Sequence, residues 1–158
     1  MGDNILMLRR LQDSPHFLEL VYQVTYRMLL PFRRWLIPGS QMERSFVWLE
    51  RVTKGPLFDC RMCGQCILHD TGMTCPMTCP KQLRNGPCGG VRLNGNCEIL
   101  PDRPCIWVLA WERSTRMPTY GGEILHIQPP VNNSLKDTSA WINDFHLQHK
   151  MTPIGWDE

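Results

Sequence analysis

The cysteines constrain this chain more than any other feature of its sequence. All eight lie between residues 60 and 105 of a chain of 158 residues. They are Cys60, Cys63, Cys66, Cys75, Cys79, Cys88, Cys97 and Cys105. Thiols gathered in this way can form disulfides, bind structural zinc or hold iron–sulfur clusters. The glycines and prolines around them predict a loop-rich module that is held together by more than apolar burial.

The rest of the sequence makes disulfides the weakest of these three explanations. The amino terminus, MGDNILMLRRLQDSPHF, lacks the apolar stretch and the small-residue cleavage site of a secretory signal. No window reaches the roughly 18 uninterrupted apolar residues of a membrane span. We therefore expect a cytoplasmic protein, and in that compartment clustered cysteines bind metal or do redox work more often than they form disulfides. The net charge of +2 is too small to indicate a nucleic-acid partner.

The spacing of the cysteines favours iron–sulfur clusters. The first three, Cys60, Cys63 and Cys66, form a Cys-x-x-Cys-x-x-Cys triplet. Zinc sites usually take their ligands as two separated pairs, whereas bacterial ferredoxins combine this triplet with a later Cys-Pro. Two such dipeptides follow, at Cys75 and Cys79. Since two [4Fe–4S] clusters require eight cysteines, we predict that all eight are ligands of two such clusters, with zinc as the alternative metal.

The same comparison with ferredoxins predicts how the ligands are shared. There the fourth ligand of a triplet's cluster comes from far along the chain. We accordingly expect Cys97 or Cys105 to complete the first site, and the remaining cysteines to form the second. His69 lies between two cysteine groups, and we interpret it as a solvated or hydrogen-bonding loop residue rather than a ligand.

Helix signals lie on both sides of the cysteine module. Ser14 followed by proline predicts a helix that ends near Pro31, and Ser40 with Glu43 forms a capping box for a second helix that Gly55-Pro56 should stop. Within the module, Asn94-Gly95 predicts a short hairpin. Pro104 should begin a third helix, and Asp137 or Thr138 should cap a last one.

These signals predict an α plus irregular fold: N-terminal helices, a loop-rich metal-binding cysteine module with a short hairpin, and C-terminal helices. We expect an N-terminal helical segment over residues 1–57, and a cysteine-rich iron–sulfur domain with a helical extension over residues 58–158. The N-terminal helices could pack on the module, dock on another subunit or lie in a membrane interface. No P-loop, GxGxxG, GxSxG or HExxH motif occurs, so the sequence shows no substrate site of its own.

Several unusual sequence motifs of this chain occur together in one known family. CRMCGQC, TCPMTCPKQLRNGPCGG, NGNCE and PCIWVLAWERS resemble the cysteine-rich domain of the methylenetetrahydrofolate reductase C-terminal family. Its best-known members are MetV-type subunits that accompany a flavin-bearing MetF-type reductase. The resemblance covers about residues 58–116 and continues more weakly to about 145. It places the family's ligands at the same eight cysteines.

The resemblance implies a function as well as a partner. The expected partner is a TIM barrel that binds FMN or FAD and reduces methylene- to methyl-tetrahydrofolate. The chain itself would be a non-catalytic, iron–sulfur electron-transfer subunit that relays electrons from a ferredoxin or another donor to that flavin. The alternative is a zinc-binding subunit that stabilises the reductase complex without electron transfer. A zinc-ribbon nucleic-acid binder is disfavoured because basic residues form no stripe with aromatic ones.

Overall fold

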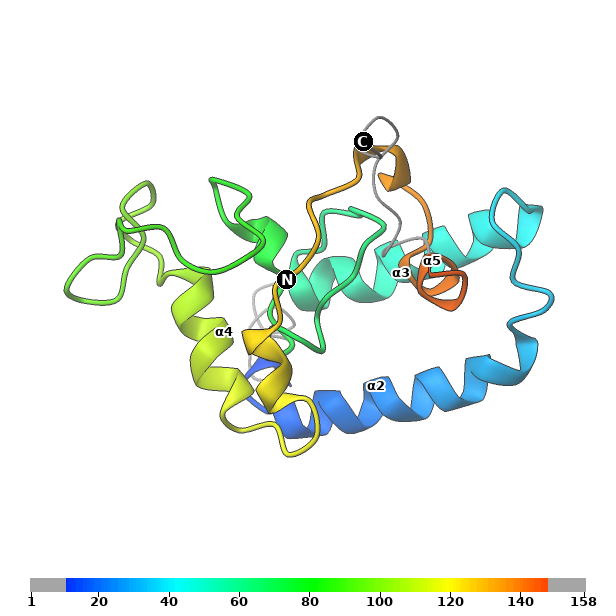
Figure 1. Ribbon diagram of the computed structural model, residues 1–158, viewed down its shortest axis with the longest axis horizontal. Helices are drawn as coiled ribbons and strands as arrows, with labels where there is room; N and C mark the ends of the chain where they lie inside the picture. Colours follow the sequence, from blue (N-terminus) through cyan, green and yellow to red (C-terminus); the bar gives the residue numbers. More distant parts are fainter. Residues whose placement is uncertain (1–10, 148–158) are drawn as a thin grey trace.

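The computed structural model describes residues 11–147, and its cysteine loops lie between helices from both ends of the chain (Figure 1). The helices are α2 (Pro15–Leu29), α3 (Gln41–Phe58), α4 (Ile106–Ser114) and α5 (Ala140–Phe145). Short 3-10 turns, among them η1 (Leu30–Phe32) and η2 (Pro76–Thr78), connect irregular segments. This arrangement confirms the predicted class of helices around a loop-rich centre.

The two N-terminal helices begin where their capping residues predict. Pro15 opens α2 directly after Ser14, and the helix passes at Leu29 into a 3-10 turn that contains Pro31. In α3, the Ser40 hydroxyl accepts a hydrogen bond from the Glu43 amide at 3.3 Å. The Glu43 carboxylate accepts one in return from the Gly39 amide at 2.6 Å, one residue earlier than in the standard capping box.

The predicted end of α3 is wrong. The helix continues through Pro56 to Phe58 and ends where Asp59 adopts a left-handed conformation with φ of 50°. Proline removes only one helical hydrogen bond, and that loss is offset because Leu57 and Phe58 pack against a buried apolar cluster. The extra turn delivers the chain directly to Cys60.

Two further boundaries differ from the sequence prediction. Helix α4 begins at Ile106 with Cys105 as its N-cap, two residues after Pro104. Helix α5 is capped by Ser139, whose hydroxyl accepts from the Ile142 amide at 3.3 Å, and neither Asp137 nor Thr138 has that role. The Asn94-Gly95 turn forms, with the Gly95 amide donating to the Arg92 carbonyl at 2.8 Å, but the described residues on its two sides form no strands. The isolated bridge in this region joins Asn96 to Pro104, a different pairing from the one that the turn predicts.

Three buried carboxylates attach the N-terminal helices to the C-terminal half of the chain. Glu19 on α2 accepts hydrogen bonds from the backbone amides of residues 119 and 120, at 2.9 and 2.7 Å. Glu43 and Glu50 on α3 both accept from Ser139, through its amide at 3.2 Å and its hydroxyl at 2.6 Å. Since a buried carboxylate is costly unless it is fully hydrogen-bonded, these contacts fix both helices against the module.

An apolar cluster lies beneath the same helices. Leu18 of α2 packs with Leu68, Met73 and Met117, and Cys66 and Cys75 lie against this cluster. The inner faces of α2 and α3 therefore pack on the chain's own cysteine module, which was one of the three roles expected for them. Among residues 11–147, no helix combines the length and apolarity that crossing a membrane requires.

Candidate metal centre

The structure gathers the cysteines around two adjoining cavities. Cys60, Cys63, Cys66 and Cys75 line the one that we call the first cavity. Cys79, Cys88, Cys97 and Cys105 line the second cavity, which has a volume of about 550 Å³ and which Cys75 also borders. All eight predicted ligands therefore lie in one of two groups of four.

The loop of the first cavity is shaped by left-handed residues and by amides that approach sulfur. Met62 and Gly64 have φ values of 49° and 72°, so the chain turns tightly between Cys60 and Cys66. The Met62 amide donates to the Cys60 sulfur at 3.4 Å. The amides of residues 68 and 77 contact the sulfurs of Cys66 and Cys75 in the same i+2 relation. Amide donors of this kind stabilise thiolates and tune a bound metal.

The fourth member of this group differs from the sequence prediction, which expected Cys97 or Cys105. The loop between Cys66 and Cys75 folds back on itself, because the Met73 amide donates to the Leu68 carbonyl at 2.8 Å. The Thr71 hydroxyl lies 2.8 and 2.6 Å from the carbonyls of residues 67 and 74 and closes the same loop. Cys75 thus returns to the triplet, whereas Cys97 and Cys105 lie in the other cavity.

The C-terminal segment closes the first cavity from outside. The Asp137 amide donates to the Met62 carbonyl at 2.8 Å, and the Asn143 side chain donates to the Gly64 carbonyl at the same distance. A Cβ atom at Gly64 would lie 2.0 Å from the Leu135 carbonyl oxygen. Only glycine fits there, so the close approach of the Leu135 backbone to the cysteine loop depends on Gly64.

Two cationic side chains face the first cavity. Arg84 and Lys54 both line it, and both are largely buried. Lys54 pairs with Glu50 at 2.8 Å, while the Nη2 atom of Arg84 donates to the Gln65 carbonyl at 3.1 Å. Apart from a contact with the Cys63 sulfur, Nε and Nη1 of Arg84 have no hydrogen-bond partner among the described residues. Buried donors without acceptors indicate a site that is completed by an anionic group.

Three thiols of the first cavity, those of Cys60, Cys66 and Cys75, have raised pKa values without such a group. Burial raises the pKa of the Cys66 thiol to about 11. Burial, with the neighbouring thiols, raises the pKa of Cys75 to about 12. A metal centre must displace these protons, so binding at the first cavity will release them.

The second cavity is built by two short segments that run antiparallel. The Cys97 amide donates to the Arg103 carbonyl and the Cys105 amide to the Gly95 carbonyl, both at 2.9 Å. These two hydrogen bonds flank the bridge between Asn96 and Pro104. They bring Cys97 and Cys105, which are eight positions apart in the sequence, to the same wall.

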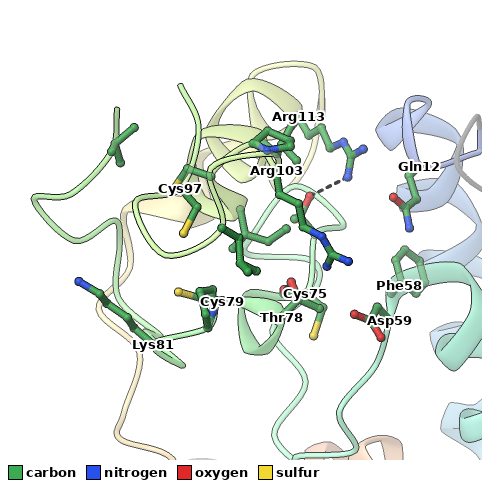
Figure 2. A pocket seen from close by; sticks show the side chains of 18 of the residues that line it. Gln12, Phe58, Asp59, Cys75, Thr78, Cys79, Lys81, Cys97, Arg103 and Arg113 are labelled. Atoms are coloured by element: carbon green, nitrogen blue, oxygen red, sulfur yellow. Dashed lines mark hydrogen bonds between the residues drawn. The ribbon is translucent and has the colours of Figure 1, made fainter. Parts of the chain in front are cut away.

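The turn η2 separates the two groups. Cys75 precedes this turn and Cys79 follows it. Figure 2 shows the Cys79 and Cys97 sulfurs directed into the same space, while the Cys75 sulfur points away from them, toward the side of Asp59. The sequence Cys-Pro-Met-Thr-Cys-Pro therefore sends one cysteine to each cavity.

The second cavity carries a carboxylate near its sulfurs. Glu98 Oε1 lies 3.7 Å from the Cys88 sulfur and also pairs with Lys81. Both charged side chains are more than a third exposed, so water screens them. The second cavity is consequently more open than the first, and two of its cations, Lys81 and Arg113, are paired with carboxylates.

The sulfur positions allow a test of which metal fits. All eight thiols are free. Among the described residues, no three cysteine sulfurs lie within 4.8 Å of one another, whereas four ligands of a tetrahedral zinc at 2.3 Å would be only about 3.8 Å apart. The wider spread suits the corners of a cubane. The first cavity, however, has only about 20 Å³ of free space, so its cysteine side chains must turn outward to admit a cluster.

His69 belongs to a separate polar group that the sequence did not predict. Its Nε2 atom lies 3.3 Å from Asp70 Oδ1 and 3.7 Å from Glu123 Oε2, and its ring stacks on Tyr22 with centroids 5.1 Å apart. Burial raises the pKa of Glu123 to about 7, with the hydrogen-bonded Asp70 as a further cause. The position of His69 agrees with its interpretation as a hydrogen-bonding residue. Glu123 is 54 positions from it, and no sequence signal linked the two.

Comparison with known proteins identifies the family of this chain. The family model described as methylene-tetrahydrofolate reductase C terminal matches residues 40–134. That range contains all eight cysteines and begins at α3, earlier than the residues on which the resemblance was recognised. No curated protein and no solved structure matches the chain. Because the matched range covers more than half of its residues, the chain belongs to the methylene-tetrahydrofolate reductase C-terminal family.

Proposed function

We propose that this chain is a cytoplasmic, non-catalytic electron-transfer subunit of a methylenetetrahydrofolate reductase complex, with one [4Fe–4S] cluster in each cavity. The observation that carries the proposal is the division of eight free cysteines into two adjoining groups of four, on either side of η2. Two redox centres in adjoining cavities are suited to passing electrons. A purely structural site has no need of a second centre beside it.

The chain's own residues supply binding and insulation. Bound clusters would supply one-electron chemistry, which a flavin in the partner converts into hydride transfer to the folate. The eight cysteines would hold the clusters. The C-terminal segment over residues 132–143 keeps water from the first cavity through its contacts with Met62, Gly64 and Gln65. The expected partners are a MetF-type subunit with FMN or FAD, and a ferredoxin or another one-electron donor.

One observation favours the zinc alternative. The small free volume of the first cavity would admit a single ion after slight movement of the thiols, whereas a cubane requires more space. In that case the chain would stabilise the reductase without carrying electrons. Arg84 and Lys54 would suit either occupant, because four thiolates around either metal leave a net negative charge.

The outer face of α2 is a candidate contact for the reductase. Large apolar side chains occupy it at helical spacing, and they continue beyond the helix into the next turn. They are Phe17, Leu20, Val21, Val24 and Met28, followed by Phe32 and Trp35, with exposed fractions from 44 to 70%. This outer strip lies opposite the face that packs on the module, so α2 is apolar on both sides. Helices of that kind are usually covered on both sides.

The charges beside the outer strip indicate an acidic partner surface. Arg27, Arg33 and Arg34 are exposed, and none of them forms an ion pair with a described residue. The one carboxylate of α2, Glu19, is buried and accepts two internal hydrogen bonds. Exposed aromatic, methionine and arginine side chains without lysine are typical of the centre of a protein interface. Membrane attachment by charge usually takes four to eight basic residues, so a protein surface with carboxylates at its rim fits better.

Co-purification with the flavin subunit tests the proposed complex. Anaerobically produced protein should be brown, bind the reductase, and pass electrons from dithionite-reduced clusters to the partner's flavin, as followed by flavin absorbance. A colourless zinc protein that binds the reductase equally well would support the alternative. Failure to bind any flavin-bearing reductase of this type would contradict the proposed complex.

Variants of the outer strip test the contact. Val24→Glu places a charge in the centre of the strip and should weaken binding to the reductase at least tenfold. Leu93→Glu is the matched control, because Leu93 is a fully exposed aliphatic residue beside Asn94-Gly95, far along the chain from α2. Equal binding by both variants would exclude the strip as the contact. Binding of the wild-type chain to anionic vesicles, lost in Val24→Glu, would assign the strip to a membrane instead.

A further inference from the structure

Arg84 has an unusual environment for a buried arginine. Its side chain is buried, and one nitrogen, Nη2, is fixed by the Gln65 carbonyl. Apart from the contact with Cys63, Nε and Nη1 have no acceptor in the part of the chain that the structure describes. A guanidinium offers five donors in a rigid fork and stays charged when buried. Donors left in this state are costly unless the occupant of the cavity accepts them.

The nearby carboxylates do not remove this positive charge from the first cavity. Glu50 is matched by Lys54 and by the Ser139 hydroxyl. Asp70 interacts with Arg84 at longer range, but it lines a different cavity, where Gln128 donates to it at 2.8 Å and where it shares a hydrogen bond with Glu123. Arg84 therefore presents its free donors to the cysteine sulfurs and not to a carboxylate.

Among the described residues, no cation of the second cavity combines burial with unpartnered donors. Its cations are Lys81, Arg103 and Arg113. Lys81 and Arg103 are exposed, and Lys81 is paired with Glu98. Arg113 is buried, but it pairs with Asp13 at 3.1 Å and donates to the Thr74 hydroxyl at 3.1 Å. The Glu98 carboxylate lies 3.7 Å from the Cys88 sulfur. Solvent screens the charges of Lys81, Arg103 and Glu98, and Asp13 offsets the charge of Arg113, whereas the charge of Arg84 acts in a dry environment. The two cavities thus differ in the charge that a metal centre would experience.

We propose that Arg84 makes the centre in the first cavity the stronger electron acceptor, so that electrons enter at the second cavity and collect at the first. The inference rests on the proposed function. Reduction adds one negative charge to a cluster, and buried N–H donors with a positive charge stabilise that added charge. Each step moves one electron: the external donor is oxidised by one electron as the second centre is reduced, and that centre is reoxidised as the first is reduced. Two such transfers supply the two electrons that a hydride requires.

A redox titration of the anaerobic holoprotein, followed by electron paramagnetic resonance, tests the proposal. The wild type should show two potentials, and Cys79→Ser, in the second cavity, should remove the signal with the lower one. Arg84→Gln should lower the higher potential, reducing the equilibrium constant for reduction about tenfold, which is 59 mV for a one-electron couple. Arg103→Gln, at the exposed side of the second cavity, is the control and should leave the higher potential unchanged.

The outcomes separate this inference from the proposed function. If clusters are present and Arg84→Gln changes neither potential, or if Cys79→Ser removes the higher potential, the inference is wrong while the cluster assignment stands. If the wild type contains no iron, both are wrong. If the Arg84→Gln protein loses its first centre, Arg84→Lys replaces it in the test, because lysine keeps the positive charge without the fork of guanidinium donors. If the higher potential is the same in Arg84→Lys as in the wild type and in Arg103→Gln, the proposed role of the Arg84 donors is wrong.

Discussion

The two cysteine cavities use the same ligand in different surroundings. The first is enclosed by α3, by a loop that folds back on itself and by the C-terminal segment, and two buried cations face it. The second is formed by turns around an isolated bridge, is open, and carries an exposed carboxylate next to Cys88. The number of cysteines therefore predicts how many metal centres are possible, while the surrounding side chains determine how each one behaves.

The difference also concerns folding. Two cysteines of the first cavity, Cys66 and Cys75, lie against the apolar cluster of Leu18, Leu68 and Met73, so its metal centre and the core form one unit. In the second cavity, Cys105 belongs to a separate apolar cluster with Trp107 and Ala110, and the other three cysteines of the group lie outside both clusters. Loss of the first centre should disturb the whole chain, and loss of the second should have a local effect.

Replacing one cysteine in each cavity should produce the largest contrast. We expect Cys66→Ser to yield insoluble or largely unfolded protein. Metal binding at the first cavity should stabilise the apolar cluster beside it, and without the metal that stabilisation is lost. Cys88→Ser should remain folded and retain about half of the metal. Metal content and circular dichroism of the soluble fraction measure both. Equal loss of structure in the two variants would remove the distinction between the cavities.

A pair of glycine variants provides a smaller contrast that does not touch a ligand. Gly64→Ala in the first cavity combines a φ of 72° with a Cβ that would lie 2.0 Å from the Leu135 carbonyl oxygen, and should lower the free energy of unfolding by on the order of 3 kcal/mol. Gly95→Ala, beside the second cavity, has a similar φ of 79° but nothing within 4 Å. It should cost only about 1 kcal/mol for the backbone conformation.

Chemical denaturation of the two variants under identical metal loading checks this expectation. Similar losses in both would mean that the close approach of the C-terminal segment does not stabilise the first cavity. The backbone strain common to the two sites would then be the main cost.

The smallest predicted effect is a pH dependence of the free energy of unfolding, caused by Glu123. Glu123 lies behind Arg84 with His69, Asp70 and His126 around it. Burial raises its pKa from 4.5 to about 7, so between these values the folded state binds more protons than the unfolded state. Stability contributed by the protonated group is present below about pH 4.5 and is lost as the pH rises to 7.

Unfolding measured between pH 5 and 8 should show this decline in the wild type, and Glu123→Gln should flatten it. Glu112→Gln, on the exposed face of α4, is the control and should leave the slope unchanged. A slope that persists in Glu123→Gln would assign the pH dependence to other groups.

The sequence predicted the helices of this fold better than the arrangement of its cysteines. Ser14, Pro15 and Ser40 determine local hydrogen bonds, so the starts of α2 and α3 could be read directly from them. The end of α3 could not, because the packing of Leu57 and Phe58 in the core outweighs the effect of Pro56. Metal-ligand residue types were evident from spacing. The return of Cys75 to the triplet depends on threonine and backbone contacts within residues 67–74 that carry no sequence motif.

Arg84 illustrates the same limit. From the sequence it was one of several basic residues near the cysteines. Its importance follows from burial and from its hydrogen bond to the Gln65 carbonyl, 19 positions away. The charged residues near metal ligands can be counted in a sequence, but the sequence does not show which of those charges are screened by water.

The central claim is that this chain holds two [4Fe–4S] centres, sorted by η2 into the two cavities. Iron, zinc and acid-labile sulfide should be measured on anaerobically purified wild-type protein and on Cys75→Ser and Cys79→Ser. We predict about eight iron and eight sulfide per wild-type chain and about four of each in Cys79→Ser, with the remaining cluster in the first cavity. Cys75→Ser should retain at most the cluster of the second cavity. A wild-type protein with about two zinc ions and no sulfide would contradict the account.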